Sequence, residues 1–310
     1  MLYYYQEKYT IMTIIDKNRI IMIMVDGFGI PSEGWQKSVY SKYCSKEFLK
    51  LLSSYSTPLD TTMTIPGIPQ SATGQTALFT GINAAQVMKR HYPAFPGPTL
   101  KKIITEQNIF KTLIQHEKSV SFANAYIRYS LSDLLRTRFS SVTTTMSGTV
   151  FKDSLNTSNL LSNSAVYHDI TRETVNKKYE VPVITPEDAA NDLINISSKS
   201  DFTLFEFFLT DIAGHKQNLD FLAKVLKILS RFILQLTSQL PSDTILLICS
   251  DHGNCEDVKI STHTYNKVPL ILFSKKYLIT PRAKSIVDVY NLIVELLINP
   301  SNSTYHNTNN

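Results

Sequence analysis

The sequence predicts an α/β protein with a doubly wound, mainly parallel sheet and an inserted smaller α+β cap domain. Three short apolar runs, at residues 19–25, 201–210 and 244–250, are each followed directly by an aspartate. Short apolar runs with polar boundaries are typical of buried strands. Apolar residues at helical spacing follow at residues 222–236 and again at 286–297. Strands that alternate with amphipathic helices favour a parallel sheet covered on both faces.

Composition excludes several classes of protein. A hydrophobic content of 43% and a charged content of 18% fit a globular chain of 310 residues. The net charge of +5 suits an anionic substrate and is too small to indicate nucleic-acid binding. Three scattered cysteines, no apolar run of membrane-spanning length and no signal-peptide pattern in residues 1–17 indicate a cytoplasmic protein without membrane contact. Translation could start at Met1 or Met12.

The domain organisation follows from a change in composition. Residues 91–183 begin with three prolines and contain a segment crowded with serine and threonine, which predicts a cap inserted into the core. The core is then discontinuous, with residues 1–90 and 184–300. The tail at 301–310 is rich in Asn, Ser and Thr, and we expect it to be disordered.

The first candidate site residue is Asp26, which follows the first strand and precedes two nearby glycines. Ligands of open α/β sheets bind at the carboxyl ends of the strands. Asp26 is therefore a candidate metal ligand, although Asp-Gly is also a common turn pair.

A candidate nucleophile lies in residues 65–84, where prolines and glycines form a loop and a helix can start at Ala72. Ser71 precedes that helix, among backbone N–H groups that can bind phosphate oxygens. The alternative is that Ser71 only caps the helix. Thr73 and Thr76 are weaker candidates for the nucleophile.

Two further segments carry ligand types that bind metals. Asp211 and His215 follow the second apolar run and would face one ion if that segment is helical. Asp251 and His252 follow the third run, with His263 close behind. The alternative is that the aspartates cap helices and the histidines are ordinary loop residues.

These segments together resemble a known family. Ser-Asp-His-Gly-Asn, an acidic residue, and His-Thr-x-Asn-x-Val-Pro, within residues 250–269, are similar to the last metal-binding block of cofactor-independent phosphoglycerate mutase. That enzyme belongs to the alkaline phosphatase superfamily, whose motif order is matched over residues 19–90 and 200–275. The resemblance implies two divalent ions, Zn or Mn, with Ser71 between them as the residue that becomes phosphorylated. It assigns one ion to Asp211, His215 and His263, and the other to Asp26, Asp251 and His252.

The chain also departs from the mutase pattern. Gln70 and Gln75 stand where the mutase has Asn and His, and its Asp-Gly-Arg-Asp element is absent. The Pro and Arg that sulfatases need after the nucleophile are absent as well. We therefore expect a phosphoesterase that acts on a small phosphorylated metabolite. A phosphomutase of the phosphoglycerate mutase or phosphopentomutase type and a catalytically silent metal-binding protein are the alternatives.

Several residues are weaker candidates for contacts with the substrate anion, because Arg and Lys suit phosphate geometry. These are Gln75, Lys89, Arg90, His91 and Arg128. His168 and Asp169 resemble a metal pair, but no apolar strand precedes them. They can be a substrate-facing pair or a structural one.

Overall fold

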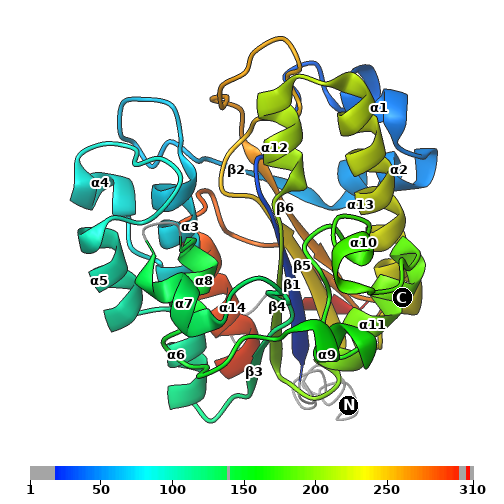
Figure 1. Ribbon diagram of the computed structural model, residues 1–310. Helices are drawn as coiled ribbons and strands as arrows, with labels where there is room; N and C mark the ends of the chain where they lie inside the picture. Colours follow the sequence, from blue (N-terminus) through cyan, green and yellow to red (C-terminus); the bar gives the residue numbers. More distant parts are fainter. Residues whose placement is uncertain (1–17, 138–139, 300–304, 308–310) are drawn as a thin grey trace, which may run out of the picture.

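A computed structural model describes residues 18–137, 140–299 and 305–307 of the chain. Among these residues, six strands form one sheet in the order β2-β6-β5-β1-β4-β3 (Figure 1). The strands β7 and β8 form a small second sheet. The strands are β1 (Arg19–Val25), β2 (Ser56–Leu59), β3 (Val120–Phe122), β4 (Phe202–Phe207), β5 (Thr244–Cys249), β6 (Val268–Phe273), β7 (Tyr277–Ile279) and β8 (Tyr305–Asn307).

The centre of the sheet is parallel. β1 pairs in parallel with both β4 and β5, and β3 pairs in parallel with β4. β6 runs antiparallel to β5 and to β2. The predicted α/β class and the mainly parallel sheet are confirmed.

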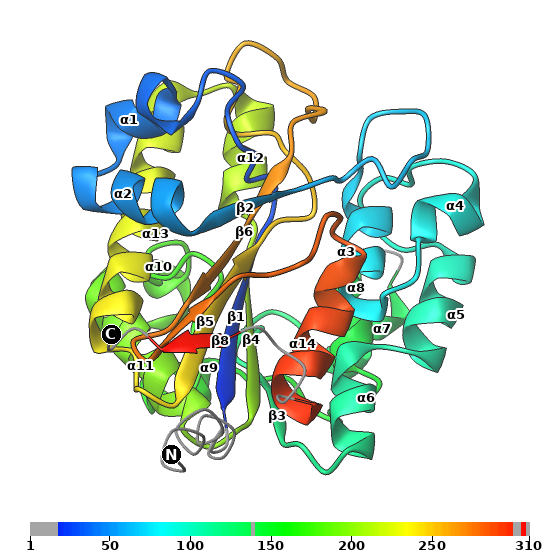
Figure 2. The same cartoon turned by 180° about the vertical axis from the view of Figure 1, so that it is seen from behind.

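Helices cover both faces of the sheet (Figures 1 and 2). One face is covered by α3 (Ser71–Thr80), α4 (Ala84–Met88), α5 (Pro98–Glu106), α6 (Ile109–Gln115), α8 (Val142–Ser147) and α14 (Asp288–Ile298). The other face is covered by α1 (Val39–Tyr43), α2 (Lys46–Tyr55), α11 (Pro186–Ser197), α12 (Leu209–Lys216) and α13 (Leu219–Gln239). Shorter elements are the 3-10 helix η1 (Trp35–Lys37) and the helices α7 (Leu131–Arg136), α9 (Thr157–Leu161) and α10 (Asn176–Tyr179).

The two hydrophobic cores explain why the strands appear in the sequence as continuous apolar runs. In β1, Ile20, Met22 and Met24 pack into one core. Ile21, Ile23 and Val25 pack into the other core. A strand that is buried on both faces needs apolar residues at every position instead of an alternating pattern.

The prediction of a separate cap is wrong for a large part of residues 91–183. β3 is the edge strand of the central sheet, and α5, α6 and α8 pack into its core. The physical reason is that apolar faces such as that of α6, with buried Ile109, Phe110 and Leu113, must be covered, and the sheet face covers them.

The predicted tail needs a smaller correction. Residues 305–307 form β8, which pairs with the edge of β7, so these three residues are ordered by backbone hydrogen bonds. The rest of the tail and both possible start methionines lie outside the described residues. Within the described ranges, no helix is both long enough and apolar enough to cross a membrane.

Candidate metal centre

The fold brings three of the predicted segments together at one edge of the sheet. β4, β1 and β5 are neighbouring parallel strands, so their carboxyl ends lie side by side. Asp26 follows β1, Asp211 lies in the first turn of α12 after β4, and Asp251 follows β5. Asp26 and Asp251 thus lie directly after their strands or one residue beyond, and Asp211 lies four residues after the end of β4.

Asp26, Asp251 and His252 form a buried cluster, here called the inner group. One ligand atom from each lies within 4.8 Å of the others. His252 Nε2 is 3.2 Å from Asp26 Oδ1 and 3.5 Å from Asp251 Oδ2. The side chains of His252 and Asp251 have no exposed surface.

Asp211, His215 and His263 form a second cluster, here called the outer group. Asp211 lies 3.4 Å from Nε2 of each histidine, and the two Nε2 atoms are 3.1 Å apart. His252 joins the two groups, because its ring stacks on His263 with centroids 3.7 Å apart. It also lies with Asp211 and His263 in a possible three-ligand set. The outer group is the more open of the two, since 44% of the His215 side chain is exposed.

The hydrogen bonds of the outer histidines fix which ring nitrogen is free. His215 Nδ1 is 2.7 Å from the Ser261 carbonyl, and His263 Nδ1 is 2.8 Å from the Pro69 carbonyl. A carbonyl oxygen only accepts, so in each neutral ring Nδ1 carries the hydrogen and Nε2 presents a lone pair. Two such lone pairs 3.1 Å apart, beside a carboxylate, fit a bound cation.

The charges around the site also favour a bound cation. Burial, together with the charges of Asp251, Asp211 and Glu206, raises the pKa of Asp26 well above its usual range. Burial also raises the pKa of Glu206 to about 7, even though Thr143 donates a hydrogen bond to it. In the described part of the chain, no Lys or Arg forms an ion pair with these four acids. A divalent cation would supply the missing positive charge.

Asp211 differs from the other acids. Burial alone would raise its pKa, but hydrogen bonds from His215 and His263, the charge of His252 and a hydrogen bond from Asn254 hold the pKa well below its usual range. The hydrogen bond to Asp211 raises the pKa of His215 to about 9, against the effect of burial, so a cation that binds Nε2 would displace a proton from this ring. The outer group therefore holds an ionised carboxylate, which is the form that binds metal.

Ser71 lies against the inner group. Its Oγ is 2.9 Å from His252 Nε2, so the predicted nucleophile lies within hydrogen-bond distance of a predicted ligand. The alternative that Ser71 is the N-cap of α3 is wrong in detail. α3 starts at Ser71, and its N-cap is Gln70, whose side chain makes no capping hydrogen bond. The two weaker candidates hydrogen-bond to the backbone of their own helix, Thr73 with Gln70 O and Thr76 with Ala72 O.

Gln75 has a role that the sequence prediction missed. It was expected to contact substrate, but its Nε2 lies 3.0 Å from Asp251 Oδ2 and 3.3 Å from Asp26 Oδ2. The side chain is buried one turn after Ser71, so it donates to the carboxylates of the inner group.

Close packing explains why the residue before Gln75, Gly74, is a glycine. A Cβ on Gly74 would lie 2.8 Å from the backbone oxygen of Asp251. α3 therefore packs directly against the segment that carries Asp251 and His252.

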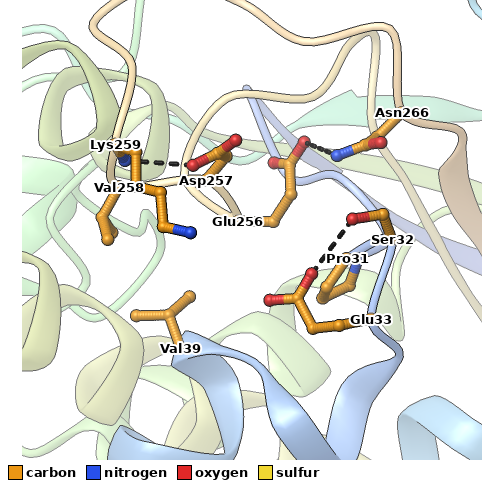
Figure 3. A pocket seen from close by; sticks show the side chains of 9 residues that line it. All are labelled: Pro31, Ser32, Glu33, Val39, Glu256, Asp257, Val258, Lys259 and Asn266. Atoms are coloured by element: carbon orange, nitrogen blue, oxygen red, sulfur yellow. Dashed lines mark hydrogen bonds between the residues drawn. The ribbon is translucent and has the colours of Figure 1, made fainter.

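Two residues that hold the ligands were assigned no role from the sequence. Asn254 donates to Asp211 Oδ1 at 2.6 Å. Glu256 accepts from Gly29 N at 3.1 Å and from Asn254 N at 2.8 Å. It also accepts from Asn266 Nδ2 at 3.1 Å (Figure 3). Glu256 thereby fixes the loop after β1 to the loop after β5. Their position in the sequence could have identified them, because Asn254 and Glu256 lie between the candidate ligands His252 and His263.

A pocket lies beside Glu256 (Figure 3). It has a volume of about 390 Å³ and lies between the loop after β1 and the loop after β5. Glu33, Asp257 and Lys259 line it, and none of the predicted metal ligands does.

The remaining predicted contacts lie outside both groups. Lys89 and Arg90 are exposed, and the Arg90 guanidinium lies over the Tyr92 ring. His91 is buried, with Nε2 3.1 Å from the Ile65 carbonyl. Arg128 is exposed. Among the described residues, none of these four makes a hydrogen bond or ion pair with the inner or outer group, so their contact with substrate stays a prediction.

The sequence left the role of His168 and Asp169 open, and in the structure Asp169 has a structural role. This carboxylate accepts from Arg172 N and from both N and Oγ1 of Thr174. His168 stacks on Phe208, the residue that precedes α12, with ring centroids 4.5 Å apart.

The fold and the site define an α/β protein with clustered ligand residues for metal, and comparison with known proteins specifies its family. The profile of the "Metalloenzyme superfamily" matches residues 134–298, more than half of the chain, and the chain belongs to this family. The match includes the outer group, Asp251 and His252, while Asp26 and Ser71 precede it. The family supports the use of divalent metal.

Solved structures share the fold at low sequence identity. The PH0037 protein from Pyrococcus horikoshii has a TM-score of 0.59 at 11% identity, covering 94% of this chain and 100% of its own. Alkaline phosphatase from the Antarctic bacterium TAB5 has a TM-score of 0.56 at 13% identity, with 91% and 98% covered. The lipoteichoic acid synthase LtaP from Listeria monocytogenes has a TM-score of 0.52 at 10% identity, with 91% and 72% covered. No curated protein matches the chain in sequence. The fold is therefore alkaline phosphatase-like.

Proposed function

We propose that this protein is a metal-dependent phosphoesterase that cleaves a small phosphate ester through a phosphoserine at Ser71. The observation that carries the proposal is the position of Ser71 Oγ, 2.9 Å from His252 Nε2, where the inner and outer groups meet. A hydroxyl beside two clusters of carboxylates and imidazoles suits nucleophilic attack on phosphorus.

Asp211, His215 and His263 would hold one divalent ion, and Asp26, Asp251 and His252 the other. The mixed nitrogen and oxygen ligands suit Zn or Mn. When bound, two such ions supply positive charge that activates a hydroxyl and neutralises phosphoryl oxygens. Gln75 and Asn254 would keep the carboxylates oriented through the hydrogen bonds they donate to them.

The reaction at Ser71 has two steps. Ser71 Oγ forms a bond to phosphorus as the bond to the ester oxygen breaks, and the alcohol leaves with a proton. Water then attacks the phosphoserine, which releases inorganic phosphate and restores the hydroxyl. The side chain of Gln70 does not cap α3, so the first N–H groups of this ten-residue helix are available to phosphoryl oxygens.

We favour hydrolysis over a phosphomutase reaction because of exposure. A mutase must keep its dephosphorylated product enclosed until the phosphoryl group returns. Here 44% of the His215 side chain is exposed, and much of residues 91–183 belongs to the core and is not part of a cap. Water access to the outer group supports hydrolysis.

The test is turnover of p-nitrophenyl phosphate with Zn or Mn present, together with elemental analysis of the protein and mass spectrometry for phosphoserine. Ser71→Ala should abolish turnover and labelling while the metal content is kept, and Ser53→Ala, on the exposed side of α2, should match wild type. Metal binding without turnover or phosphoserine would show a silent metal-binding protein. The mutase alternative is tested with ribose 1-phosphate and 3-phosphoglycerate as substrates, and an isomerised product without free phosphate would show a mutase.

A further inference from the structure

The side chain of Glu256 is a buried carboxylate that belongs to neither the inner nor the outer group. It is 4% exposed. Its Oε2 accepts hydrogen bonds from Gly29 N and Asn254 N. Its Oε1 accepts from Thr264 Oγ1 and Asn266 Nδ2. An ionised carboxylate offers about four lone-pair sites, and these donors occupy all of them. Glu256 therefore holds segments of the protein together and has no lone pair left for a metal.

Two glycines show how closely the backbone approaches this carboxylate. A Cβ on Gly29 would overlap the carboxylate of Glu256. A Cβ on Gly253 would overlap both that carboxylate and Thr264 Oγ1. Neither position can carry a side chain while Glu256 stays in place, so the loop after β1 and the loop after β5 are both shaped around it.

The outer group depends on this carboxylate at two of its ligands. Asn254, whose N–H donates to Glu256, donates its own Nδ2 to Asp211 Oδ1 at 2.6 Å. Thr264 directly follows His263, and its hydroxyl donates to Glu256. Glu256 therefore helps to set the position of Asp211 relative to His263, whose Nε2 lies 3.4 Å from Asp211 Oδ1.

The inner group has support that does not involve Glu256. Gln75 donates to both of its carboxylates. Thr210 Oγ1 donates to the carbonyl of Asp26. Phe28 N donates to Ser250 Oγ at 2.9 Å, which joins the loop after β1 to the residue before Asp251. The inner ligands would keep these contacts without Glu256.

We propose that Glu256 is a positioning residue for the outer group, where it raises the affinity for the bound ion. Ligands that are held in place by their neighbours bind metal more tightly, so the residues that orient them contribute to the affinity. The inference deepens the proposed function, because it rests on the two ion sites described there. It is measured as metal binding without turnover, so its failure and the failure of the proposed hydrolysis are separate results.

The experiment removes metal from the loaded protein with increasing concentrations of a chelator and counts the remaining ions by elemental analysis. Wild type should lose its ions in two steps, and Asp211→Asn identifies the outer step because that step is missing. Glu256→Gln keeps the size of the side chain but replaces one accepting oxygen with an NH₂ group, which cannot accept a hydrogen bond. The affinity of the outer step should then fall by about 10- to 100-fold, while the inner step is unchanged.

Glu33→Gln is the matched control. Glu33 lines the same pocket as Glu256, but it is exposed and its carboxylate accepts from Ser32 Oγ (Figure 3). This variant makes the same change of charge close to the same place. Both steps should match wild type, because Glu33 makes no hydrogen bond to a ligand-bearing loop in the described part of the chain.

A second pair of variants tests the proposal even if Glu256→Gln does not fold. Thr264→Val keeps the shape of the side chain and removes one donor to Glu256. It should lower the affinity of the outer step about fivefold, the effect of one hydrogen bond. Thr264→Ser keeps the hydroxyl and should match wild type.

Three results would overturn the proposal. Unchanged affinities in Glu256→Gln would show that its hydrogen bonds do not position the ligands. A loss of equal size in both steps would show a general structural role instead of a role in the outer group. Wild type that holds fewer than two ions would remove the ion sites themselves, and this failure is visible before any variant is made.

Discussion

Replacing Gly74 with alanine tests how tightly α3 packs against the inner group. Alanine is favoured over glycine inside a helix by about 1 kcal/mol. The added Cβ would lie 2.8 Å from the backbone oxygen of Asp251, however, and 3.2 Å from its Cβ. Overpacking of this kind costs about 1–3 kcal/mol, and a backbone atom cannot move aside as a flexible side chain would. We expect a net loss of about 1 kcal/mol and a fall in Tm of roughly 2–4 °C.

The same variant should also weaken metal binding. A shift of Asp251 would displace two ligands of the inner group, Asp251 itself and the adjacent His252. Loss of the contacts that orient metal ligands lowers metal affinity by about 10- to 100-fold. Calorimetric titration with Zn or Mn measures the affinity, and thermal unfolding measures the stability. Gly34→Ala is the control, because its Cβ would meet nothing within 4 Å while its φ of +82° makes alanine unfavourable. It should lower Tm and leave metal affinity unchanged.

A Gly74→Ala protein that is more stable than wild type by about 1 kcal/mol, with unchanged affinity, would refute this reasoning. The gain in helix propensity would then be the whole effect. Close contact between α3 and Asp251 would not constrain the site.

Three other predictions concern metal and pH. Asp211→Asn and His263→Ala should each remove the ion of the outer group, and elemental analysis that finds full metal content in both would contradict the assignment. Removal of metal by a chelator should lower Tm, because the buried carboxylates lose their compensating charge. Added Zn or Mn should restore Tm, and an unchanged Tm after complete metal removal would contradict the prediction. Burial lowers the pKa of His168 to about 4, against the charge of Asp169. Because the unfolded imidazole takes up a proton near pH 6.5, the stability of wild type relative to His168→Gln should fall between pH 6.5 and 4, by at most about 3 kcal/mol. Parallel curves of unfolding free energy against pH would show that His168 is not buried in neutral form.

The parts of the site that the sequence predicted share one feature. Asp26, Asp211 and Asp251 each follow an apolar run directly, and adjacent parallel strands bring such positions together. His215 follows Asp211 at helical spacing, which already predicted that the two share an ion. His263 could be added to them only through the family resemblance, since nothing in the local pattern specifies a contact between His215 and His263 across 48 residues.

The missed parts depend on tertiary packing. Residues 119–123 already indicated a strand, but a strand this short does not reveal which sheet it joins, so β3 was assigned to the cap. Gln75 looks like any polar helical residue until α3 is placed against Asp251. Glu206 could have been noticed, because a single acid in the apolar run of β4 is buried at a cost that requires a partner.

The difference in exposure between the two groups has a consequence for the order in which metal is loaded. Asp251 and His252 have no exposed side-chain surface, and the His252 ring lies against His263 of the outer group. If two ions are held as proposed, the inner one is the more enclosed, with 12% of the Asp26 side chain as its exposed ligand surface, whereas the outer one is open to solution through His215. The inner ion would then exchange more slowly than the outer one. At limiting free metal, activity would follow the filling of the outer group.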